Sequence, residues 1–159
     1  MHTAHLYDQD FEQWAQTQVD LLRQGNTQQL DVEHLIAELE DMGKSSLRTL
    51  ESRFIILIAH LLKWHYQRPT LAEQWKDFEG KSWRKTIIEQ RAQLGFLLDK
   101  VPSLKPSLEL ARQEAYPTAR QLAIKETGMP PTTFPSECTY TVDDLLNDDF
   151  YPTEAITPH

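Results

Sequence analysis

The chain has 159 residues, of which 40% are hydrophobic and 25% are charged, a balance typical of one soluble globular domain. No apolar run is long enough to cross a bilayer, and the first residues have neither the basic start nor the apolar core of a signal peptide. We therefore expect a cytoplasmic protein without a membrane segment. The single cysteine, Cys138, excludes an internal disulfide and any cysteine-rich zinc site.

Charge is distributed unevenly along the chain. Residues 1–43 carry nine acidic and one basic residue (net −8), residues 44–105 carry six and twelve (net +6), and residues 106–159 carry nine and three (net −6). The basic middle could bind nucleic acid, or the acidic ends could pack against it. We favour the second explanation, because a chain of net charge −8 repels phosphate at long range.

Helical periodicity dominates, and no alternating strand pattern is found. A first helix is predicted from about residue 10 to 24, ended by Gly25. A second is predicted from about Val32 to Met42, with Asp31 as its N-cap and Gly43 as its end. Its apolar stripe, expected to face the core, comprises Val32, Leu35, Ile36, Leu39 and Met42.

A third helix is predicted from about residue 46 to 66. Its segment SRFIILIAHLLKWHYQ (52–67) is apolar on nearly every side, so other helices must surround it. It nevertheless carries His60, Lys63 and His65, and polar groups inside such a core need partners. Pro69 is expected to end the helical pattern, and residues 69–81 to form a polar connection that contains Trp75 and Phe78.

Two further helices are predicted, at about 83–100 and 103–127, the second interrupted by Pro117 and ended by Gly128. After residue 129 the chain becomes rich in proline, with one short helical turn at about 142–147. The fold expected is an all-α, single-domain bundle of about five helices over residues 1–128. Residues 129–159 are expected to form an extended tail, part of the same domain, packed on the surface of the bundle.

The polar residues within apolar stripes are the candidate site. We expect one network or polar pocket made of Glu38, Glu40, His60, Lys63 and Arg91, since a buried arginine or lysine needs a carboxylate. At 100° per residue His60 and His65 face different neighbours, which argues against a metal shared between them. A divalent metal held by His60 and Glu38 is a less favoured alternative, and we predict no cofactor.

A basic cluster, Lys81, Arg84 and Lys85, lies near Trp75 and Trp83, a mixture found on nucleic-acid surfaces. A solvated helix face with core tryptophans is the more common explanation. The sequence has no glycine-rich phosphate loop and no GxSxG motif.

As a set, several short segments resemble the bacterial family catalogued as domain of unknown function, number twenty-nine. The match covers roughly residues 5–152 in order, with Thr139 where the family is expected to have proline. The resemblance implies a soluble helical protein without an established activity, and it supplies no catalytic residue. The segments are Tyr7-Asp8, Asp10-Phe11, Trp14, Glu33-x-Leu35-x-x-Glu38-Leu39-Glu40-x-x-Gly43, His60-Leu61-Leu62-Lys63-Trp64, Trp83, Thr86-Ile87, Gln90-Arg91, Pro102-Ser103-Leu104, Glu126-Thr127-Gly128, Phe134-Pro135 and Cys138-x-Tyr140-Thr141.

Together these features favour a non-enzymatic module that binds another macromolecule, and we expect this partner to be a protein. Nucleic acid is disfavoured by the net charge. The alternative is a metal-assisted hydrolase or nuclease-like enzyme with its site around Glu38 and His60.

Overall fold

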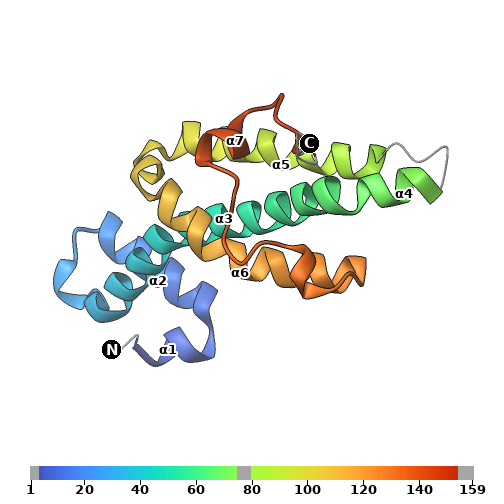
Figure 1. Ribbon diagram of the computed structural model, residues 1–159. Helices are drawn as coiled ribbons and strands as arrows, with labels where there is room; N and C mark the ends of the chain where they lie inside the picture. The colour runs from blue at the N-terminus through green and yellow to red at the C-terminus, as the bar shows by residue number, and fades with distance from the viewer. Residues whose placement is uncertain (1–3, 75–79, 154–159) are drawn as a thin grey trace. The chain divides into compact units, whose positions relative to one another are not determined.

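The computed structural model describes residues 4–74 and 80–153. These residues form seven α-helices and three short 3-10 helices, and no strand occurs among them (Figure 1). The prediction of an all-α protein is therefore confirmed. None of the described helices has a stretch long and apolar enough to pass through a bilayer.

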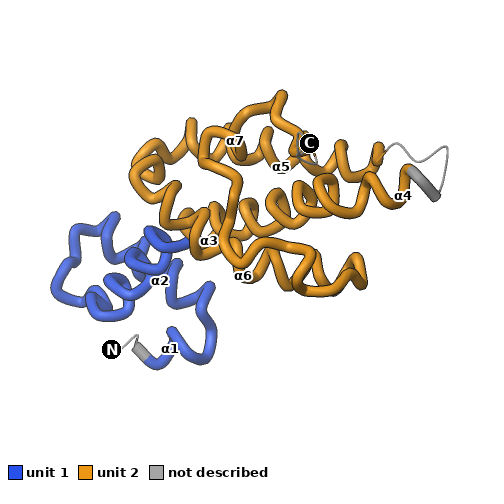
Figure 2. Tube along the Cα trace, viewed as in Figure 1, with its two compact units in different colours: residues 1–45 blue, residues 46–159 orange. Residues whose placement is uncertain are grey.

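The chain divides into two compact units, residues 1–45 (unit 1) and residues 46–159 (unit 2), coloured blue and orange in Figure 2. Unit 1 has a small set of buried side chains, and unit 2 has a large one. We describe them separately.

Unit 1 contains α1 (Ala4–Gln9), α2 (Phe11–Arg23), η1 (Thr27–Gln29) and the beginning of α3 (Val32–Tyr66). The start of α2 follows from its N-cap, since the Asp10 carboxylate accepts a hydrogen bond from the Gln13 amide at 3.1 Å. Gly25 ends this helix by adopting a positive φ of 71°. The predicted helix 10–24 is thus reproduced to within one residue at each end.

Helix α3 corrects the sequence-based boundaries. The two helices predicted at 32–42 and 46–66 are one continuous helix of 35 residues, which passes through Gly43. Gly43 is not among the glycines with positive φ, which are Gly25, Gly80 and Gly128. A glycine ends a helix only when it takes that left-handed conformation; inside a helix it costs about 1 kcal/mol relative to alanine, which the rest of the helix can offset.

Unit 2 contains the remainder of α3, followed by α4 (Arg68–Gln74), α5 (Lys81–Lys100), η2 (Pro102–Ser107) and α6 (Leu108–Thr127). Pro69 does not begin a polar connection, because it is the second residue of α4, where a helix needs no amide donor. Trp75 and Phe78, predicted in that connection, lie outside the described residues.

The core of unit 2 is built around α3, which lies between α5 and α6 (Figure 1). The segment predicted to be apolar on nearly every side is indeed buried. Its side chains with almost no exposed surface are Phe54, Leu57, Ile58, Ala59, Leu61, Leu62 and Lys63. Helix α5 contributes Ile87, Leu94 and Leu98 to this core, and α6 contributes four alanines and Tyr116. The alanines allow the helices to approach closely.

The segment after α6 contains η3 (Pro131–Thr133) and α7 (Val142–Leu146), which packs on α5 and α6. A capping box starts α7, because the side chains of Thr141 and Asp144 each accept a hydrogen bond, at 3.0 Å, from the other's backbone amide. The segment is part of the core, since Phe134, Tyr140 and Leu145 are buried in it.

Because Leu145 has no exposed surface, Leu145→Ala should lower the free energy of unfolding by about 2–5 kcal/mol, through lost burial and the cavity left behind. Urea denaturation measures this change. Leu110→Ala, the same change at an exposed position of α6, should cost less than about 0.5 kcal/mol. Equal effects at the two positions would show that α7 does not belong to the core.

Candidate functional site

Arg91 binds backbone carbonyls of the C-terminal segment, and not the carboxylate that the sequence predicted. Its Nε donates to the Leu145 carbonyl at 2.9 Å, and its Nη2 donates to the carbonyls of Asp144 at 3.1 Å and Phe150 at 2.8 Å. The side chain is 4% exposed, and this burial lowers the pKa of the guanidinium. Arg91 therefore links α5 to residues 144–150 through hydrogen bonds.

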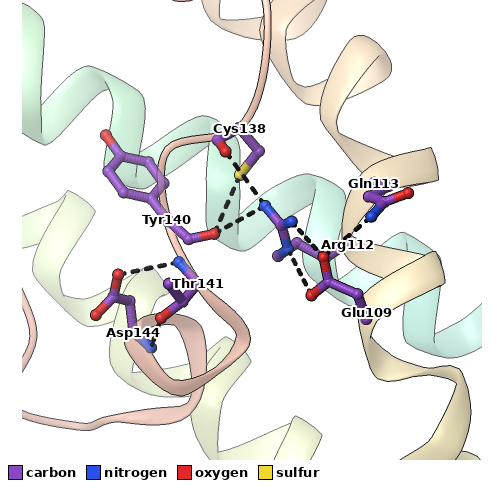
Figure 3. A network of polar contacts seen from close by, with 7 residues as sticks. All are labelled: Glu109, Arg112, Gln113, Cys138, Tyr140, Thr141 and Asp144. Atoms are coloured by element: carbon purple, nitrogen blue, oxygen red, sulfur yellow. Dashed lines mark hydrogen bonds and ion pairs between the residues drawn. The ribbon is translucent and has the colours of Figure 1, made fainter.

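Two arginines of α6 bind the same segment in chain order. Arg120 donates to the carbonyls of Pro131 at 2.6 Å and Phe134 at 3.3 Å. Arg112 donates through Nη1 to the carbonyls of Cys138 at 3.2 Å and Tyr140 at 3.0 Å (Figure 3). Its other nitrogens bind the Glu109 carboxylate, and these hydrogen bonds lower the pKa of Glu109 to about 2.

These three arginines explain how an extended segment without sheet partners can be buried. Its backbone carbonyls accept no hydrogen bonds from a neighbouring strand, and a buried carbonyl without a donor lowers the free energy of unfolding. This role was not predicted from the sequence. A signal was present, since two arginines stand eight residues apart on one predicted helix, just before a proline-rich segment without strand character. A cavity of about 450 Å³, lined among others by Arg112, Tyr116 and Cys138, lies beside this segment.

His60 and Lys63 also have partners other than the predicted ones. Lys63 forms an ion pair with Glu126 of α6, and its ammonium lies 6.0 Å from the centre of the Trp83 ring. The Nδ1 atom of His60 is 2.8 Å from the Ile56 carbonyl of its own helix. Burial is the main cause that lowers the pKa of each side chain, and it favours the neutral form. The Nδ1 atom of His65 is 2.9 Å from the Tyr140 hydroxyl. The two histidines thus have different neighbours, as their different helix faces predicted.

The two glutamates of the predicted network belong to unit 1. Glu38 accepts a hydrogen bond from the Tyr7 hydroxyl, and Glu40 is exposed. Glu38 and His60 lie 22 positions apart on α3, which is one helix and not the two helices that the prediction assumed. The network of Glu38, Glu40, His60, Lys63 and Arg91 as a whole stays a prediction; the partners observed for Lys63 and Arg91 are Glu126 and backbone carbonyls. A functional role for any one of them stays a prediction.

The other sequence candidates are not assembled into a site. Within the described ranges, no three His, Cys, Asp or Glu side chains are grouped so that they could hold a metal ion. Of the basic cluster, Lys85 pairs with Glu89 at 4.0 Å and the Arg84 guanidinium lies 5.6 Å from the centre of the Tyr151 ring. Trp75 lies outside the described residues.

Unit 1 is held together by a small polar and aromatic cluster around Asp31. The carboxylate of Asp31 accepts a hydrogen bond from Trp14 Nε1 at 2.9 Å and lies 2.6 Å from His34 Nδ1. The Tyr7 ring stacks on His34 with a centroid distance of 3.9 Å. Among the described residues of unit 1, the buried apolar side chains are Trp14, which belongs to this cluster, and Leu21.

Four of the five residues of the apolar stripe predicted to face the core are instead exposed along the first part of α3, and the fifth, Leu35, is half-buried. We call these four the α3 stripe; their exposed fractions are Val32 53%, Ile36 50%, Leu39 64% and Met42 67%. At 100° per residue they share one face of about 120°. Seven of the ten exposed large hydrophobic side chains among the described residues lie in unit 1: the four of the α3 stripe and three on α2. A contiguous apolar face of this kind typically marks an interaction site.

Comparison with protein families matches residues 6–151 to the family described as Domain of unknown function DUF29. The chain belongs to this family. The resemblance based on the short segments is thereby confirmed. Comparisons with curated proteins and with solved structures find no match. Membership in the DUF29 family gives no activity, so the α3 stripe is assessed on its own geometry.

In this DUF29 family member, Arg91→Lys should lower the free energy of unfolding by about 2–4 kcal/mol, because one ammonium cannot replace three donor groups and leaves buried carbonyls unsatisfied. Hydrogen exchange should also become faster at residues 144–150. Arg84→Lys, the same change at an exposed position, should alter neither quantity. If Arg91→Lys behaves like Arg84→Lys, Arg91 does not hold the segment.

The pKa of His60 predicts a loss of stability in acid. Burial lowers this pKa below its ordinary value of 6.5, so the unfolded chain takes up a proton that the folded chain does not. The free energy of unfolding should therefore fall as the pH drops below about 6.5, and His60→Gln should reduce this fall. Urea denaturation of both proteins at about pH 7.5 and about pH 5.5 measures the difference. An equal loss in both proteins would contradict the assignment.

Proposed function

We propose that the chain is a non-enzymatic module, in a bacterial cytoplasm, that binds another protein through the α3 stripe. The observation that carries this proposal is the exposure of Val32, Ile36, Leu39 and Met42 along one face of α3. Three successive helical turns with an apolar face of this kind are how helix-in-groove recognition is built.

A protein partner is preferred over nucleic acid because of charge. Residues 1–45 carry nine acidic and two basic residues, a net charge of −7, which repels phosphate groups. In this proposal unit 2 is the scaffold: a helical bundle whose core includes side chains of the Pro-rich tail, which is held by arginines 91, 112 and 120.

The first test asks whether the stripe is uncovered in the protein alone. Ile36→Asp with Leu39→Asp should change the free energy of unfolding by less than about 1 kcal/mol, since each side chain is half exposed or more. Urea denaturation of the purified protein measures this. A loss above about 3 kcal/mol would mean that the stripe is a buried folding face, and the proposal would be wrong.

The second test asks whether the stripe binds a partner. The immobilised protein and the Phe96→Asp variant, which changes an exposed apolar residue of unit 2, should retain the same protein from an extract of the source cells. The Ile36→Asp, Leu39→Asp variant should not retain it, and the purified partner should reproduce this difference in calorimetry. Equal retention by all three proteins would contradict the proposal.

A further inference from the structure

We infer that the partner segment which covers the α3 stripe is a basic amphipathic helix of another protein. This inference rests on the proposed function and adds the chemical class of the partner. It follows from the shape of the stripe and from the charges along its edges.

The shape of the stripe fits a helix. Its members stand at positions i, i+4, i+7 and i+10 of one helical face, so they form a row about 15 Å long. Two packed helices bury such rows by placing the ridges of one in the grooves of the other. A partner helix of about three to four turns covers the whole row.

The charges at the edges select a basic helix. In the helical projection Glu33 and Glu40 stand two turns apart along one edge of the stripe, and both are exposed. Glu38 stands on the other edge, where it accepts the hydrogen bond from Tyr7. The lysine in residues 32–45 is Lys44, which stands one turn beyond Glu40 and past Met42, the last member of the stripe. Lysine or arginine flanking the apolar face of the partner would lie opposite these glutamates, as interface charges are usually arranged.

The same charges disfavour a second copy of this chain. Two copies joined symmetrically through the α3 stripe would bring two units of net charge −7 together. They would also bring the exposed Glu33 and Glu40 of both copies to one interface, and like charges facing each other weaken association. A partner with the opposite charge has neither cost.

The test uses two designed peptides of about 18 residues with the same leucine stripe, one with lysine and one with glutamate at every polar position. Binding of each labelled peptide to the whole chain is followed by fluorescence anisotropy, at low salt and at higher salt. The lysine peptide should bind at least about tenfold more tightly, and salt should weaken its binding.

Two pairs of variants separate the apolar and charged contributions. Ile36→Asn with Leu39→Asn should weaken binding of the lysine peptide about tenfold or more, whereas Phe96→Asn should not. Glu33→Gln with Glu40→Gln should weaken it about threefold to tenfold and reduce its salt dependence. Glu12→Gln with Asp20→Asn changes the charge of unit 1 by the same amount, but on α2. This control pair should change the logarithm of the dissociation constant by less than half as much.

Each other outcome overturns the inference in a recognisable way. If both peptides bind equally and the Asn variants abolish both, the stripe is a docking surface but its partner is not selected by charge. If neither peptide binds, or if the two glutamate pairs act alike, the basic helix is wrong. If the protein dimerises by analytical ultracentrifugation, and the Asn variants abolish the dimer, the occupant is a second copy.

Discussion

Helix α3 continues without a break through Gly43, so residues 32–66 form one helix that begins in unit 1 and ends in unit 2. The sequence had predicted a stop at Gly43, with residues 32–42 and 46–66 as two separate helices. Without that stop, residues 32–45 and 46–66 follow each other along one helix and carry their apolar side chains into different surroundings. In unit 2 these side chains, from Leu50 to Leu62, are enclosed by α5 and α6. In unit 1 Val32, Ile36, Leu39 and Met42 remain exposed.

The second organising feature is the set of arginine–carbonyl contacts in unit 2. The segment after α6 has little regular structure, yet it places Phe134, Tyr140 and Leu145 in the core. Burial of such a segment requires donors for its carbonyls, and arginine supplies several from one planar group. Arg120, Arg112 and Arg91 meet the segment in that order along the chain. Charged residues that would ordinarily suggest a binding site here serve the fold.

Much of the fold could be predicted from sequence because it depends on local signals. Periodicity indicated the helices, and Gly25 and Gly128 ended theirs in the left-handed conformation. Gly43 shows the limit of that signal, since the sequence does not say whether a glycine takes a helical or a left-handed conformation. The partners of Arg91 and Lys63 could not be predicted either, because the carbonyls of residues 144–150 and the carboxylate of Glu126 are brought near by tertiary packing. The apolar periodicity of residues 32–42 was recognised correctly, but periodicity alone cannot distinguish a face that packs within the chain from one that awaits a partner.

The central claim is that the α3 stripe is open in the protein alone and covered in its complex. Methyl NMR with a soluble paramagnetic probe measures this directly at Ile36, Leu39 and Met42. The account predicts strong broadening of these three methyl signals in the protein alone, comparable to that of exposed Leu110, and protection once a basic helix is bound. Signals that are as protected in the protein alone as those of buried Leu57 would contradict it.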